Sequence, residues 1–186
     1  MTYARGFAPW ICFAALSAVD WRLGLCAAAV AALVLLAGQL RKRSIDLLGS
    51  ATCGFFVVMA AIALADPTSG VHDWTSALAS GTLAIVALAS LAVRKPFTLA
   101  IARTTVPAKF WNSRRFIHAN MVITSAWAAA FTCSAVACAL IAGYGHSDIV
   151  MLVTVQVLAF AIPLAFSNRY AGRARAAADQ VAVAGG

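Results

Sequence analysis

Long apolar runs alternate with short polar segments along the whole chain. Most runs approach the roughly 20 residues that cross a bilayer as a helix. They are rich in Ala, Leu and Val and do not alternate between apolar and polar residues, which favours helices over the strands of a membrane barrel. The six predicted spans are residues 6–19, 23–40, 45–65, 74–93, 119–142 and 149–167.

The charged residues lie between these runs and are unevenly distributed. Of the 14 Lys and Arg residues, 13 fall at the two ends of the chain and in every second connection, and Arg22 is the exception. The positive-inside rule then places both termini in the cytoplasm. We expect an all-α bundle of six membrane helices over residues 1–168, followed by a basic and then Ala-rich cytoplasmic tail over 169–186.

Composition narrows the class of protein. Apolar residues make up 63% of the 186 residues and charged residues 11%, whereas soluble domains have about half and about a quarter. A soluble core of this size could not hide so much apolar surface. The composition also excludes a disordered chain and a disulfide scaffold. The net charge of +8 is explained by cytoplasmic loops rather than by a nucleic-acid partner.

The first predicted span, 6–19, is short and contains Pro9. One interpretation is a membrane helix followed by a tight turn at residues 20–22, with Trp21 at the level of the outer headgroups. The other is a cleaved signal peptide with Arg5 in its charged region. Cleavage would leave five crossings and place the new N-terminus outside.

Small residues recur at four-residue spacing in four of the predicted spans, which allows close helix packing in membranes. These stripes are Gly24, Ala28 and Ala32; Ser50 and Gly54; Ala77 and Gly81; and Ala126, Ala130, Ser134 and Cys138.

Polar side chains at membrane depth are few. Gln156, with Thr154 beside it, is the most polar, and it either forms an interhelical hydrogen bond or lines a pathway. Asp46 lies near the interface, and we expect it to pair with the basic residues 41–43. Pro163 is expected to kink the last span.

No catalytic or metal-binding set can be assembled. His72 and His146 are expected on the outer side and His118 on the inner side, and all are expected in loops. Cys133 and Cys138 are expected on different faces of one helix. We therefore predict no catalytic residue, no metal and no cofactor, and a protein that is not an enzyme.

The most distinctive segment is the inner connection over residues 94–118, which mixes basic and aromatic residues. Phe97 and Ile101 are expected to share one face of a short helix that ends at Pro107. The segment either lies along the anionic inner leaflet or serves only as a positive-inside loop. The candidate headgroup residues are Arg94, Lys95, Phe97, Arg103, Lys109, Trp111, Arg114 and Arg115.

The order of these features resembles the intracellular septation protein A family of small bacterial inner-membrane proteins, over roughly residues 6–165. The most specific parts are Lys95-Pro96 and Pro107 four residues before Trp111. The chain departs from the pattern by a longer stretch from Trp111 to Trp127, by the lack of an acid between Pro96 and Pro107, and by the lack of an Ala-Thr pair near Cys26-Ala27. We therefore expect a distant relative or a member of a related family. The other matching residues are Pro9-Trp10 and Phe13 before Asp20, RKRSIDLLG at 41–49, Trp74, RKPF at 94–97, and Trp127 with Phe131.

The resemblance implies a non-catalytic role in cell-envelope maintenance or septation, through contacts with lipids and other membrane proteins of the bacterial inner membrane. The alternative is a small transporter or channel for a neutral or apolar solute. Coupling to protons or sodium is disfavoured, because no carboxylate is expected at membrane depth. A lipid-modifying membrane enzyme is a third hypothesis.

Overall fold

The computed structural model describes the backbone of residues 2–17, 19–41, 43, 46–66, 68–145 and 149–184, and the side chains of these residues from 8 to 173. Within these ranges the chain is helical and contains no strand, which confirms the predicted all-α class. The elements are α1 (Thr2–Leu16), α2 (Trp21–Arg41), α3 (Leu47–Ala65), α4 (Val71–Ala92), α5 (Thr98–Ala102), the 3-10 turn η1 (Ala108–Phe110), α6 (Arg114–Gly143) and α7 (Ile149–Ala184).

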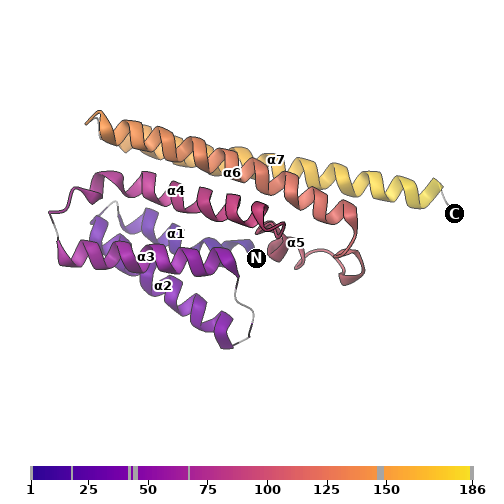
Figure 1. Cartoon of the computed structure of the whole chain (residues 1–186), viewed down its shortest axis with the longest axis horizontal. Coiled ribbons are helices and arrows are strands. Elements are labelled where there is room, and N and C mark those ends of the chain that lie inside the picture. The colour runs from indigo at the N-terminus through magenta and orange to yellow at the C-terminus, as the bar shows by residue number, and fades with distance from the viewer. Residues whose placement is uncertain are drawn as a thin grey trace.

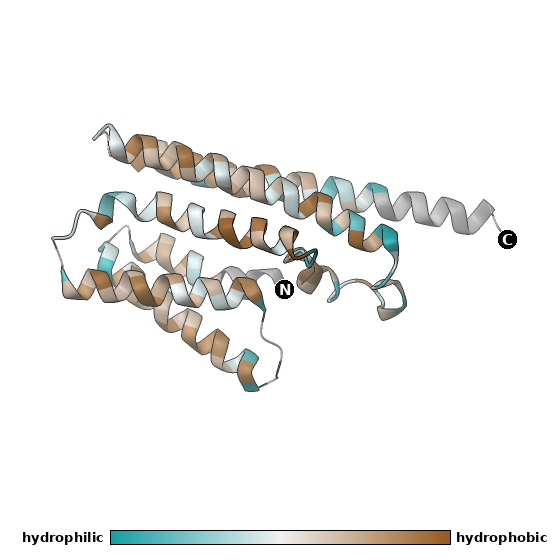
Figure 2. Ribbon diagram, viewed as in Figure 1, coloured by the Kyte–Doolittle hydropathy of each residue, from teal (hydrophilic) through white to brown (hydrophobic). Residues whose placement is uncertain are grey.

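Five of the helices, α2, α3, α4, α6 and α7, are long and apolar enough to cross a membrane. The protein is therefore a multi-pass helical membrane protein by length and composition. The first predicted span, 6–19, corresponds to α1, whose 15 residues reach about 22 Å, short of the roughly 30 Å of a bilayer core. Figure 2 shows that the hydrophilic residues gather near the helix ends and in the connections.

Several helices extend beyond the predicted spans; α1 begins at Thr2 and ends at Leu16 rather than spanning 6–19, and α6 and α7 show the largest extensions. Helix α6 begins at Arg114 rather than at residue 119, and α7 continues from 149 to Ala184 without the expected end near 167. Ala, which is frequent after residue 170, is the strongest helix former, so the last span and the start of the tail form one helix. At about 1.5 Å per residue such a helix exceeds the bilayer core, and part of it must lie outside.

The long helices run alternately up and down the longest axis of the molecule (Figure 1). Helices α1, α2 and α3 form one group, and α4, α6 and α7 form the other. Helix α4 joins them, because it contacts α3 on one side and α6 on the other. The start of α1 and the end of α7 lie at the same end of the bundle as α5 (Figure 1).

Each group has its own apolar core. In the first, Phe56 and Leu25 are fully buried among the small residues of α2 and α3. The second is built on Leu83, Ala84, Trp127 and Phe131. Trp10 of α1 packs against both cores, and its indole nitrogen donates a hydrogen bond to Thr52 of α3 (3.4 Å). Helix α1 is therefore an integral part of the bundle.

The stripe of small residues on α2 is confirmed as a packing surface, since Gly24, Ala28 and Ala32 are all buried. At Gly24 the backbone of α2 comes very close to Ser17, which follows the end of α1. The expectation for α3 is wrong, because Gly54 is exposed and no atom of another element lies within 4 Å of its missing side chain. Gly81 of α4 is half-buried, but it too has no atom of another element within 4 Å of its missing side chain.

We expect Gly24→Ala to destabilise the protein by about 1–3 kcal/mol, because the added methyl overpacks the α1–α2 contact. It would lie 2.8 Å from the Ser17 nitrogen and 2.9 Å from its Cβ. The thermal unfolding midpoint in detergent micelles measures the effect. Gly54→Ala is the matched control and should leave the midpoint unchanged or raise it slightly. Equal midpoints for the two variants would contradict the close contact.

Helix α4 ends with an arginine in a backbone conformation that is usually adopted by glycine. Arg94 adopts a left-handed backbone (φ 55°), the N–H of Arg94 bonds to the Leu91 carbonyl (2.9 Å), and the N–H of Lys95 bonds to the Ser90 carbonyl (2.9 Å). This is the Schellman pattern, in which the left-handed position is usually glycine. Helix α6 follows that preference with Gly145 (φ 67°). Arg94 therefore holds a backbone conformation that glycine would adopt without strain.

We expect Arg94→Gly to unfold at a higher temperature than Arg94→Ala, with a stability difference of about 1 kcal/mol. Both variants lose the guanidinium, so the difference between them reports the backbone alone. Thermal unfolding in detergent measures it. Indistinguishable midpoints would mean that the left-handed position carries no strain.

Candidate functional site

Most of the Lys and Arg residues that the structure describes lie at one end of the bundle. At this end α2 ends, α3 begins and α4 connects to α6 (Figure 1). We call this the basic end. Every Lys and Arg whose side chain the structure describes lies there or on the adjoining part of α7, apart from Arg22 in the first turn of α2. Among the described acids, Asp46 alone lies at the basic end, whereas Asp20, Asp66 and Asp73 lie at the opposite end.

The predicted basic and aromatic connection is folded against the bundle. The Phe97 N–H donates to the Ser90 hydroxyl of α4 (3.2 Å). Thr98, which opens α5, is buried, donates to the Asn120 carbonyl (3.2 Å) and shares a hydrogen bond with the Thr124 hydroxyl (2.8 Å). Helix α5 is therefore fixed to both α4 and α6.

The predicted boundaries of the short helix are wrong. Phe97 precedes α5 rather than lying inside it, and the helix ends at Ala102. Pro107 does not terminate it but precedes η1, because proline has no N–H and is suited to the position before or at the start of a turn. Phe97 is half-buried against the core of the second group, so it anchors the connection rather than facing the membrane surface freely.

Beyond α5 the connection closes on itself. The guanidinium carbon of Arg103 lies 5.3 Å from the centre of the Trp111 ring, within cation–π range. The Trp111 indole N–H donates to the Val106 carbonyl (2.8 Å). Lys109 lies over the Phe110 ring at 5.0 Å. The connection thus presents exposed cations on aromatic supports, an arrangement suited to the headgroup layer.

Arg114 and Arg115 are exposed in the first turn of α6 rather than in a loop. The N-terminus of a helix carries partial positive charge, so two cations there oppose the helix dipole at a cost of about 0.3–1 kcal/mol each. Through the helix dipole, these two charges therefore do not stabilise the start of α6. An external anion near this terminus would offset the cost.

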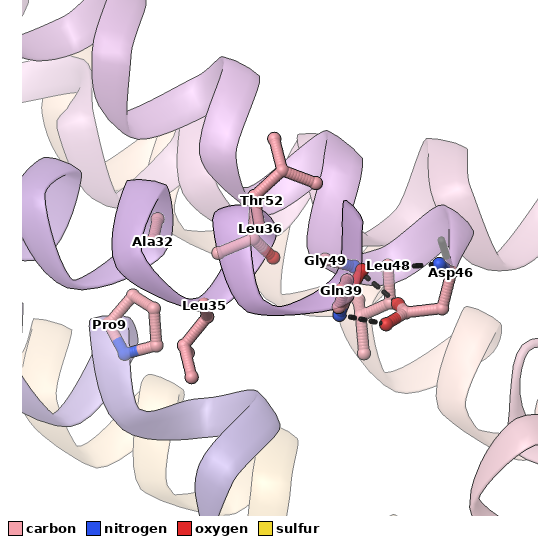
Figure 3. A pocket seen from close by; sticks show the side chains of 9 residues that line it. All are labelled: Pro9, Ala32, Leu35, Leu36, Gln39, Asp46, Leu48, Gly49 and Thr52. Atoms are coloured by element: carbon pink, nitrogen blue, oxygen red, sulfur yellow. Dashed lines mark hydrogen bonds between the residues drawn. The ribbon is translucent and has the colours of Figure 1, made fainter. Parts of the chain in front are cut away.

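Asp46 was expected to pair with the basic residues 41–43. It forms no ion pair with Arg41 or Arg43, and Lys42 lies outside the described residues. Its carboxylate instead accepts hydrogen bonds from the Gln39 amide and from the Gly49 N–H (2.6 Å), the latter as the N-cap of α3. Figure 3 shows this arrangement beside a cavity of about 40 Å³ between α1, α2 and α3. Helix capping satisfies the N–H groups of α3, and this local bond outcompetes a solvated ion pair.

A second and larger hollow lies between α3 and α5. It is a cleft of about 450 Å³, within the range of small-molecule sites. We call it the α3–α5 cleft. It brings together Lys95 and Arg103, two of the predicted headgroup residues, with Asp46. Its principal lining residues are Asp46, Leu47, Lys95, Phe97, Leu99 and Arg103.

Gln156 makes the interhelical hydrogen bonds that were one of its two interpretations. Its carbonyl oxygen accepts from the Ser80 hydroxyl of α4 (3.0 Å) and from the Ser134 hydroxyl of α6 (3.1 Å). The two hydroxyls lie 3.0 Å apart. Thr154 is exposed and donates to the Val150 carbonyl of its own helix (2.7 Å). Gln156 therefore joins three helices, and Thr154 joins none.

We expect Gln156→Leu to destabilise the protein by about 0.5–2 kcal/mol, because both serine hydroxyls lose their common acceptor. Thermal unfolding in detergent measures this loss. Replacing all three groups (Ser80→Ala, Ser134→Ala and Gln156→Leu) should recover stability relative to Gln156→Leu, since no hydroxyl is then left with a missing partner. Thr154→Val is the control and should have no effect; a loss of equal size there would contradict the three-helix contact.

Several polar residues that position the site were not singled out from the sequence. Gln39 holds Asp46, and Asn120, Thr98 and Thr124 fix α5. Gln39 and Asn120 had a signal, since an amide inside an apolar run requires a partner. The two threonines had none, because threonine is common in membrane helices and usually bonds to its own helix.

The remaining candidates are scattered. His72 lies in the first turn of α4 rather than in a loop, 3.4 Å from Asp73 and 4.9 Å from the Trp21 ring. His118 is exposed at the basic end on α6, and His146 lies outside the described residues. Cys133 is exposed and Cys138 buried, which confirms that they occupy different faces. In the described ranges no three His, Cys, Asp or Glu side chains come together as a metal site.

Comparisons with protein-family models, with curated proteins and with solved structures give no match to this chain. The functional interpretation therefore depends on the geometry of the bundle, on the distribution of its charges and, for the cellular process, on the sequence resemblance alone.

Proposed function

We propose that this protein is a non-catalytic multi-pass protein of a bacterial cytoplasmic membrane, which acts in envelope maintenance or septation through contacts with lipid headgroups and other membrane proteins. The observation that carries the proposal is the basic end. Its cations are exposed, two of them oppose a helix dipole, and two others lie over aromatic rings. Such a surface is suited to an anionic leaflet.

The orientation follows from the same observation. We propose that α1 crosses the membrane with the five longer helices and that both ends of the chain lie in the cytoplasm. The start of α1 and the end of α7 share the basic end (Figure 1), and the positive-inside rule assigns such an end to the cytoplasm. The packing of Trp10 against both cores supports retention of α1 over its removal as a signal peptide.

The arrangement of polar groups favours contact over transport. The carbonyl oxygen of Gln156 is occupied by two serine hydroxyls from neighbouring helices. Ser80 and Ser134 are themselves buried. These groups bind helices to one another, so their polarity has a structural explanation. The resemblance to the septation protein family supports the process in which the contacts are proposed to act.

We expect the combined substitution of Lys109, Arg114 and Arg115 by Gln to weaken retention of phosphatidylglycerol by the purified protein at least about tenfold. Each base near an anionic surface contributes about 1 kcal/mol before screening. Native mass spectrometry of lipid adducts measures retention.

In cells that lack the natural gene, the same variant should fail to restore envelope integrity and normal division. A fluorescent protein fused to its C-terminus should still fluoresce, which reports insertion with a cytoplasmic C-terminus.

Two controls separate charge from folding and from transport. The combined change Lys109→Arg, Arg114→Lys and Arg115→Lys keeps every charge and should behave as the natural chain does. Gln156→Leu should restore envelope integrity and normal division in cells that lack the natural gene. The opposite pattern would contradict the proposal: the variant with Gln at 109, 114 and 115 restores envelope integrity and division fully, whereas Gln156→Leu is inserted in the membrane but does not. In that case the transporter hypothesis replaces the proposal.

A further inference from the structure

The α3–α5 cleft combines opposite charges that do not neutralise each other. Lys95 and Arg103 line it from the connection after α4, and Asp46 lines it from the start of α3. Among the described residues, no ion pair joins Asp46 to either base. The cleft therefore offers two cations and one carboxylate to a ligand with complementary charges.

Each charged group is held on a supported element. Asp46 is fixed by the Gln39 amide and the Gly49 N–H, yet each carboxylate oxygen retains capacity for a further donor. Arg103 has one face of its guanidinium against Trp111, which leaves its N–H edges available. Lys95 follows the fixed end of α4. The supports limit the entropy lost when a ligand binds.

We propose that the α3–α5 cleft binds a phosphoethanolamine group, as carried by the headgroup of phosphatidylethanolamine. In this arrangement Lys95 and Arg103 bind the phosphate, and Asp46 accepts hydrogen bonds from the primary ammonium. The inference depends on the proposed function, because it assumes that the basic end meets lipid headgroups. It adds that one site at this end distinguishes a headgroup by its amine.

The chemistry of the three charges distinguishes between headgroups. All phospholipids carry a phosphate that could bind Lys95 and Arg103, so this contact does not distinguish one headgroup from another. The carboxylate adds selectivity, because a primary ammonium supplies both positive charge and N–H donors, whereas the quaternary amine of a choline headgroup has no N–H. A glycerol headgroup supplies hydroxyl donors without charge. Leu47, Phe97 and Leu99 provide apolar walls that suit the glycerol and upper acyl region of a lipid.

The test uses the full-length protein in detergent and measures adducts by native mass spectrometry. Phosphatidylethanolamine, phosphatidylcholine and phosphatidylglycerol with identical acyl chains are offered in competition. The natural chain should favour phosphatidylethanolamine about tenfold over phosphatidylcholine, as expected for a charge-assisted hydrogen bond. The combined change Lys95→Gln and Arg103→Gln should abolish the preferred adduct.

Asp46→Asn is the decisive variant. Asparagine caps helices as well as aspartate does, so α3 should fold. The Gln39 amide must turn over to accept from the asparagine side chain, which gives up only the 3.3 Å bond from the backbone N–H of residue 46 to the Gln39 side-chain oxygen. The variant should lose the preference for phosphatidylethanolamine over phosphatidylcholine while still retaining phospholipid. Asp73→Asn, at the opposite end, is the matched control and should keep the preference. Leu99→Trp, which fills the cleft without changing charge, should weaken the adduct independently.

Free phosphoethanolamine distinguishes the source of the group. If it displaces the lipid at millimolar concentration, the cleft takes the soluble group as well; if it does not, the binding requires the lipid. Equal binding of phosphatidylethanolamine and phosphatidylcholine by the natural chain, or an unchanged preference between these two lipids in Asp46→Asn, would overturn the inference. Failure of the proposed function is seen separately, since Lys109, Arg114 and Arg115 lie outside the cleft and are tested with anionic lipid.

Discussion

The hydrogen-bonded contact between α4 and α6 is the interaction on which the rest of the structure depends. In hydrocarbon a polar group without a partner costs several kcal/mol, so buried hydroxyls and amides must find each other. Ser80 and Ser134 do so with Gln156 of α7, and Thr98 does so with Thr124 near the basic end. Throughout the described side chains, no buried nitrogen or oxygen lacks a hydrogen-bond partner.

The cost of polar groups in hydrocarbon also determines where the charged side chains of the protein lie. A charged side chain is even more costly in hydrocarbon than an unpaired hydroxyl or amide, so the ionised side chains lie at the two ends of the bundle. The bonds from α4 and α6 to residues 97 and 98 hold α5 at the basic end. They thereby determine where Lys95 and Arg103 stand relative to α3. A stabilising contact inside the bundle thus positions the charged groups at its surface.

Much of the fold could be predicted from the sequence, because hydropathy determines which segments can enter a bilayer. Spans α2, α3 and α4 agree closely with expectation, and an interhelical hydrogen bond was one of the two interpretations of Gln156. Its partners Ser80 and Ser134 could not be predicted, since serine has no distinctive periodicity and pairing depends on how helices pack. Asp46 was expected to pair with residues 41–43 because they are the nearest bases in the sequence. Its carboxylate instead caps α3 and accepts from Gln39, seven residues away. The cleft also could not be foreseen, because it joins elements distant in sequence.

The α3–α5 cleft lies between the two groups of helices, and this has an energetic consequence. Asp46 belongs to the first group through α3, while Lys95 and Arg103 belong to the second through α4 and α5. In a membrane no hydrophobic force drives the groups together, because lipid tails are as apolar as the helices. A headgroup that bridges the cleft would add charge-assisted bonds across this junction. Since a ligand that binds only the folded state stabilises it, such a lipid would act as a structural component of the bundle as well as a contact of its surface.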